Sequence, residues 1–157
     1  MLKLIDVYDG MEVRKHAAQF LYELLLEREP NGNISHKVAP TFEQHRQFVV
    51  RKPYRFWYLI ERLDPGPAGE RLWVGTISAT ERNEIGVCLQ KAYREKGIGP
   101  MALRMFMSAH HPLPSSATLR SGEWIANIAP GNEHSKHVFQ KLGFTKLQET
   151  YSRKGSP

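Results

Sequence analysis

The sequence predicts an α/β fold in a single domain, and three observations lead to this prediction. Strand-like segments and amphipathic helical segments alternate along the 157 residues. Three strand-like runs follow one another in the middle third, "YRFWYLIE", "LWVGTISA" and "EIGVCLQ", and such close succession favours an antiparallel meander. The length suits one domain with a complete core. We therefore expect residues 1–157 to form a mixed, mostly antiparallel sheet of about six strands flanked by about four helices.

The N-terminal third supplies one strand and two helices. Residues 2–7 read as a strand that ends at the turn "YDG". From residue 11 to about residue 28 the apolar side chains recur at helical spacing, and Pro30 follows the end of this helix. Thr41, with Gln44 three residues later, predicts the N-terminal cap of a second short helix. The segment "RLDPGPAGE" predicts a hairpin loop between the first two strands of the meander.

The C-terminal third alternates helix, strand, helix and strand. Apolar residues at helical spacing predict a helix that begins at two glycines; they are Ile98, Met101, Ala102, Met105, Phe106 and Ala109. The loop "HHPLPSSATLRSG" then leads to a strand expected at residues 123–128. A last helix over residues 133–142 is capped by Asn132 and ended by Gly143. A closing strand is expected at residues 144–151.

Composition limits the classes of partner. The net charge is +6 and the isoelectric point is about 9.5, which favours an anionic partner without identifying it. The one cysteine, Cys88, excludes an internal disulfide and a zinc site built from cysteines. A reducing, cytoplasmic location is therefore expected. No apolar run is long enough for a membrane span, and the adjacent His110 and His111 lack a third ligand nearby in sequence, so we expect no metal.

The stretch "YREKGIGPMAL" (93–103) has the pattern of an anion-binding loop. A strand precedes it and a helix follows, and the first turn of a helix leaves backbone N–H groups without partners. Gly97 and Gly99 allow close approach, while Arg94 and Lys96 add positive charge. The Walker and dinucleotide-binding patterns do not fit. What fits is R-x-x-G-x-G over residues 94–99, which by itself is equally compatible with a plain turn.

A second motif, "NEHSKHVFQKLGF" (132–144), gives the first one a context. The two motifs occur in this order, each behind an expected strand. Together they resemble the GNAT superfamily of acyl-CoA N-acyltransferases, whose element order is similar to that expected here from residue 2 to about residue 150. The resemblance implies an acetyl-CoA-dependent enzyme that transfers an acyl group directly to an amine.

The resemblance also implies which residues hold coenzyme A. The pyrophosphate would lie on the loop, chiefly against backbone groups of Arg94, Glu95, Lys96, Gly97, Ile98 and Gly99. The pantetheine arm would pair with the strand upstream, at Val87, Cys88 and Leu89. Further contacts with the cofactor are implied for Asn132, Ser135 and Phe139, although Asn132 also suits a helix cap.

The acid–base chemistry is less completely specified. Glu84 is the first candidate for the general base that deprotonates the amine, followed by Glu81 and Tyr58, and for Glu84 a surface carboxylate is an equal alternative. Many relatives carry a tyrosine where this chain has Phe139, which cannot protonate the leaving thiolate. Ser135 or water would then supply the proton, the coenzyme would leave as the thiolate, or activity would be reduced. We expect Cys88 to be a core residue and not an acyl carrier.

The sequence does not identify the amine that accepts the acyl group. Segments 30–40 and 110–122, with the second helix, would select it, and they carry no clear pattern. An amino sugar, an amino acid, a polyamine, a protein N-terminus or a nucleic-acid base would each fit. The positive charge favours an anionic acceptor such as a nucleotide sugar or nucleic acid. The alternative function is a degenerate module that binds coenzyme A or nucleic acid without catalysis. The chain ends soon after Tyr151, and a second subunit could cover the sheet edge there, giving a homodimer.

Overall fold

The computed structural model describes residues 1–28, 38–63, 72–114 and 122–155, without the side chains of Met11 and Glu12. The segments expected as loops at 30–40, 62–70 and 110–122 therefore lie partly outside the described residues. None of the described helices is both long enough and apolar enough to span a membrane.

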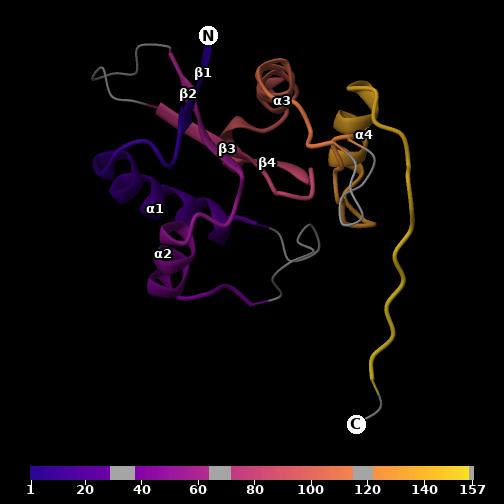
Figure 1. The fold of residues 1–157 in the computed structure, drawn as a ribbon, viewed down its shortest axis with the longest axis horizontal. Coiled ribbons are helices and arrows are strands. Elements are labelled where there is room, and N and C mark those ends of the chain that lie inside the picture. Colours follow the sequence, from indigo (N-terminus) through magenta and orange to yellow (C-terminus); the bar gives the residue numbers. More distant parts are fainter. Residues whose placement is uncertain (29–37, 64–71, 115–121, 156–157) are drawn as a thin grey trace.

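Four antiparallel strands form the sheet, in the order β1-β2-β3-β4 (Figure 1). They are β1 (Leu2–Asp6), β2 (Phe56–Arg62), β3 (Leu72–Ala79) and β4 (Ile85–Leu89). The last three are the aromatic and β-branched runs of the middle third, so the predicted meander is confirmed. Because β4 is the last strand in this order, one of its edges faces away from the ladder.

Helices cover both faces of the sheet. Figure 1 shows α1 (Met11–Leu26) and α2 (Phe42–Val50) on one face and α3 (Ile98–Ala109) on the other, with α4 (Glu133–Lys141) beside the β4 end. The predicted α/β class is confirmed. The cap of α2 is also as predicted: the Thr41 hydroxyl accepts from the Gln44 amide at 3.2 Å, and the Gln44 side chain accepts from the Thr41 amide at 2.8 Å.

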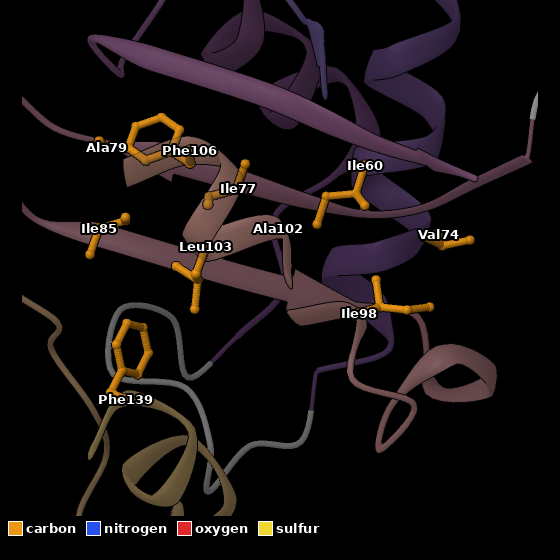
Figure 2. Packing of buried hydrophobic residues seen from close by; sticks show 10 residues of the cluster. All are labelled: Ile60, Val74, Ile77, Ala79, Ile85, Ile98, Ala102, Leu103, Phe106 and Phe139. Atoms are coloured by element: carbon orange, nitrogen blue, oxygen red, sulfur yellow. The ribbon is translucent and has the colours of Figure 1, made fainter. Parts of the chain in front are cut away.

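Two hydrophobic cores hold these layers together. The core under α1 and α2 contains Leu21, Val49 and Leu59. The core under α3, drawn in Figure 2, joins strand residues such as Ile77 to the fully buried Phe106 of α3. Val87 and Leu89 of β4 pack against the core under α3. Successive strand residues point to opposite faces, so Gly86 and Cys88 face the side of α1 and α2.

Two of the expected strands do not form. Residues 123–128 make a single parallel bridge, between Ile125 and Glu84, and residues 144–155 belong to no ladder. The prediction was wrong at both places, because a strand needs a paired edge as well as a suitable sequence. The Phe144 ring packs against Phe139 at 5.0 Å, but residues 145–155 are exposed and run away from the sheet in Figure 1. Trp124, expected on a strand, is therefore not on one.

Candidate active site

The segment between β4 and α3 has an unusual backbone. A 3-10 turn at Lys91–Tyr93 leads to Glu95, with φ of 60°, and to Gly97, with φ of 73°. Gly97 is the N-cap of α3. A positive φ disfavours residues with a Cβ, so glycine at position 97 suits the backbone that starts the helix there. Among the described residues, no atom lies within 4 Å of a Cβ added at this position, so the space next to the Gly97 Cα is open in that part of the chain.

Five consecutive amides in this loop, those of residues 95–99, donate to no hydrogen-bond acceptor in the described part of the chain. The first helical bond of α3 runs from the Met101 amide to the Gly97 carbonyl at 3.2 Å. Alternation of left-handed and ordinary residues turns successive amides toward one side, which makes an anion-binding concavity. The helix dipole adds partial positive charge at the same place. The geometry therefore fits a phosphate-sized anion.

The side chains around the loop have separate tasks. Arg94 donates from Nε to the carbonyl of Leu89 at 3.0 Å, so its guanidinium joins the loop to the end of β4. Lys96 is exposed, and its ammonium lies 5.7 Å from the centre of the Tyr93 ring. The Lys91 amide donates to the Glu27 carboxylate at 2.7 Å, which ties α1 to this loop. Lys96 thus extends into solvent beside the loop.

The register of β4 decides which backbone groups point outward. The Gln90 amide donates to the Val74 carbonyl and the Thr80 amide to the Glu84 carbonyl, both at 3.0 Å. In an antiparallel ladder, pairs that exchange hydrogen bonds alternate with pairs that do not. Gly86 and Cys88 lie at every second position between Glu84 and Gln90, so their backbone groups also bond to β3.

Val87 and Leu89 consequently turn their backbone away from β3. The Val87 amide and carbonyl and the Leu89 amide have no hydrogen-bond partner among the described residues. Of the three β4 residues expected to pair with an extended ligand, the ladder therefore leaves two available. It turns the backbone of Cys88 toward Thr76, so the pairing predicted for Cys88 would need a contact other than its backbone.

The segment at 125–128 leaves β4 just beyond Glu84. The Ile85 amide donates to the Ile125 carbonyl at 2.8 Å, and the Ile125 amide donates to the Asn83 carbonyl at 2.9 Å. After Ile125 no backbone hydrogen bond joins the segment to β4 within residues 72–114 and 122–155. The outward groups of Val87 thus lie beyond the point where segment 125–128 separates from β4.

Glu84 stands at this point of separation, and both of its carboxylate oxygens are bonded. The Thr80 hydroxyl donates to Oε2 at 3.2 Å, and the Asn127 amide group donates to Oε1 at 3.1 Å. Sequence reasoning missed Thr80 and Asn127. No sequence signal could have found Asn127, because it meets Glu84 through a parallel bridge between segments about forty residues apart in the chain.

Tyr58 is placed elsewhere. Its ring packs under α3, 6.1 Å from the Phe106 ring and 5.5 Å from the His110 ring, and burial raises the pKa of its phenol. Since Glu84 precedes Ile85 on the strand, its side chain points to the face of α1 and α2. The structure thus puts Tyr58 and Glu84 on opposite faces of the sheet. Glu81 is exposed in the turn between β3 and β4.

The α4 residues divide between capping and packing. The Asn132 side chain accepts from the Ser135 amide at 3.1 Å and caps the helix as expected. Ser135 is half-buried in the first turn of α4, whereas Phe139 is 6% exposed and packs into the core under α3 (Figure 2). Cys88 was expected in a core, but it is half-buried and belongs to neither hydrophobic cluster.

His110, at the end of α3, belongs to an aromatic cluster. Its imidazole stacks on Phe56 at 4.1 Å between ring centres. Burial lowers the pKa of His110, with a further contribution from the charge of Arg55. Among the residues that the structure describes, no three His, Cys, Asp or Glu side chains gather into a group that could hold a metal ion.

Comparison with protein families decides the membership of this chain. Residues 14–145 match the family model described as an acetyltransferase (GNAT) domain. The chain belongs to the GNAT acetyltransferase family. The resemblance stated from the two sequence motifs is thereby confirmed. A search of curated proteins finds no sequence match to the chain.

Solved structures of low sequence identity share the fold. A spermidine N-acetyltransferase from Vibrio cholerae, described as dodecameric, superposes with a TM-score of 0.63 at 12% identity, over 94% of this chain and 81% of that one. RimL, the ribosomal L7/L12 alpha-N-protein acetyltransferase, in complex with coenzyme A, gives 0.62 at 18%, over 92% and 80%. The putative acetyltransferase yncA from Salmonella typhimurium, with acetyl-CoA, gives 0.57 at 15%, over 92% and 79%.

Proposed function

We propose that this GNAT domain is an acetyl-CoA-dependent N-acyltransferase that acts on a primary amine. One observation carries the proposal: five consecutive unpartnered amides at the start of α3 adjoin a β4 edge that offers unpaired backbone groups. A pyrophosphate and an amide-containing arm are the two features of coenzyme A that such a site would hold. The fold is shared with the coenzyme A complex of RimL and the acetyl-CoA complex of yncA.

The loop residues fit coenzyme A in charge, in space and in hydrogen-bonding capacity. The amides of residues 95–99 would donate to the pyrophosphate, with the exposed Lys96 as a nearby cation. The open space at Gly97 would let phosphate oxygens approach the backbone. The outward carbonyl of Val87 and the outward amide of Leu89 would pair with the pantetheine amides, as a further strand would.

The chain's own groups would then carry the transfer. A thioester supplies an electrophilic carbonyl, and the outward amide of Val87 would donate a hydrogen bond to its oxygen. Glu84 would accept a proton from the attacking amine, directly or through a water molecule. Phe139 is buried and has no proton to give, so the Ser135 hydroxyl or water would protonate the leaving thiolate. Tyr58, on the other face of the sheet, has no part in this scheme.

The acceptor amine is proposed at the level of its class. Among the proteins of similar structure, one is a spermidine N-acetyltransferase and another, RimL, is a ribosomal L7/L12 alpha-N-protein acetyltransferase. The net charge of +6 favours an anionic acceptor such as a nucleotide sugar or nucleic acid. We also propose a cytoplasmic location, and a homodimer in which a second subunit packs against the exposed segment 145–155.

Release of the coenzyme A thiol tests the function. Acetyl-CoA is incubated with the protein and with spermidine, an N-terminal peptide, an amino acid or an amino sugar nucleotide, and free thiol is measured against time. We expect saturable, amine-dependent release with at least one acceptor. We also expect a loss of about 10²–10⁴-fold in kcat for Glu84→Gln, the usual contribution of a general base.

The second candidate, a binding module without turnover, is favoured by the phenylalanine at position 139. Tight binding of acetyl-CoA with no thiol release for any amine of the panel would support the module and contradict the enzyme. Binding of random DNA that weakens steeply with salt, together with no affinity for coenzyme A, would instead indicate a nucleic-acid-binding protein.

A further inference from the structure

We propose that Asn127 is a positioning residue that orients the Glu84 carboxylate for proton transfer, with Thr80 as the second holder. The inference rests on the proposed function, because it assigns a role to Asn127 only through Glu84. The inference adds a residue from segment 122–128, which neither sequence motif includes.

The contact geometry supports a positioning role. The Asn127 Nδ2 donates to Oε1 of Glu84 at 3.1 Å, and the Thr80 Oγ1 donates to Oε2 at 3.2 Å. Each carboxylate oxygen therefore has one donor that fixes it. A carboxylate offers about four lone-pair sites, so one site on each oxygen remains for an incoming amine or water. The two donors hold the group in place and leave it able to accept a proton.

Asn127 reaches Glu84 because of the parallel bridge at Ile125. Side chains two residues apart on an extended segment point to the same face, and paired residues of neighbouring parallel strands do so as well. Asn127 lies two residues beyond Ile125, the bridge partner of Glu84. Its amide group thus stands on the face of α1 and α2, on the side of β4 where the outward groups of Val87 become available.

The bond contributes little to holding the two segments together. The junction already has two backbone hydrogen bonds, from the Ile85 amide at 2.8 Å and from the Ile125 amide at 2.9 Å. Asn127 is exposed, and truncating an exposed side chain usually leaves the stability of a protein nearly unchanged. Without the amide, the Glu84 side chain would regain rotamer freedom, and a misplacement of about 1 Å can cost about 10²-fold in rate.

The amide group of Asn127 matters for the bond to Glu84 as well as the size of its side chain. An amide donates a hydrogen bond to a carboxylate, whereas a carboxylate at the same place would repel it. Asn127→Asp keeps the shape of the side chain and removes the donor, so it is the matched variant for hydrogen bonding. Glu123→Gln is the control for the segment, because Glu123 is exposed on the same segment and makes no part of the proposed site.

A double-mutant cycle in the thiol-release assay tests the inference. We expect Asn127→Ala and Asn127→Asp to lower kcat by about 10–100-fold, with unchanged KM for acetyl-CoA and unchanged Tm. Glu123→Gln should keep the wild-type rate. In a Glu84→Ala background, Asn127→Ala should cause no further loss, because residues that act as a unit are non-additive.

Three outcomes would overturn the inference and leave the acyltransferase function standing. An Asn127→Ala variant with full kcat would show that the amide is not needed. A loss that is the same in the Glu84→Ala background would show that Asn127 does not act through Glu84. An active wild-type enzyme whose activity survives Glu84→Ala would remove the base itself, while the acyltransferase function would stand. A wild-type protein without amine-dependent release would instead contradict the proposed function, and the inference with it.

Discussion

Replacement of Gly97 separates the backbone requirement of the loop from its binding role. Gly97 has φ of 73°, and an added Cβ would meet no atom of the described residues within 4 Å. Alanine and glutamate at this position therefore share the same backbone strain, and the Cβ of each has open space among those residues. They differ in that glutamate brings a negative charge next to the five unpartnered amides. The comparison of Gly97→Ala with Gly97→Glu isolates the effect of that charge on anion binding.

The magnitudes follow from general values. A residue with a Cβ in the left-handed region costs about 1–2 kcal/mol, so both variants should melt roughly 2–8 °C below the wild type. At an acetyl-CoA concentration of about 100 Kd, binding stabilises the wild type by about 2.7 kcal/mol, which is a rise of about 5–11 °C. A carboxylate about 4 Å from a phosphate charge costs about 4 kcal/mol at an effective dielectric of about 20. That weakens binding by about 10³-fold and abolishes the rise.

Thermal unfolding with and without acetyl-CoA measures both effects. We expect Gly97→Glu to show no rise in Tm with ligand, although its Tm without ligand matches that of Gly97→Ala. Gly97→Ala should show a rise that is reduced but present. A Gly97→Glu variant with the wild-type rise would refute the placement of the pyrophosphate on this loop.

Three further predictions concern the frame of the site. Gly75→Ala should destabilise the protein by about 1–3 kcal/mol in chemical denaturation, because its Cβ would lie too close to the Cys88 carbonyl oxygen and force β3 and β4 apart; unchanged stability would contradict this. Asn83→Ala should cost about 1–3 kcal/mol, since the buried Asn83 side chain donates to the Leu113 carbonyl at 2.9 Å and accepts from its amide at 2.7 Å; a cost below about 0.5 kcal/mol would refute it. The pKa of His110 in the folded protein lies below its ordinary value of 6.5, so the unfolded chain binds a proton at this residue at a higher pH than the folded protein does. Stability therefore falls as pH drops below about 6.5. His110→Phe should reduce the difference in Tm between about pH 7.5 and 5.5, and an unchanged difference would contradict this.

Local patterns allowed the loop and its flanking elements to be predicted. The glycines, the basic residues and the apolar spacing after residue 98 all lie within a short stretch, and their physical effects do not depend on distant pairing. The cap of α2 at Thr41 and the cap of α4 at Asn132 were predictable for the same reason. The meander was predictable because consecutive strands usually pair.

Features that depend on register and distant pairing could not be predicted. Which of the residues 87–89 turn their backbone outward depends on the ladder with β3, because a shift of one residue exchanges inward and outward groups. The contact of Asn127 with Glu84 depends on a bridge between segments far apart in sequence. The segment at 144–151 has strand-like composition, but β-propensity depends on packing against neighbours, and in the described residues no strand lies beside it.

Backbone amide NMR during titration with coenzyme A tests the placement of the acyl donor, because it reports on each amide separately. We predict that the largest shifts fall on the loop amides of residues 95–99 and on the outward amides of Val87 and Leu89. The Cys88 amide, which pairs with β3, should shift less than its two neighbours. Saturable shifts that cluster elsewhere, with residues 95–99 unchanged, would contradict the claim that this loop and the β4 edge hold the acyl donor.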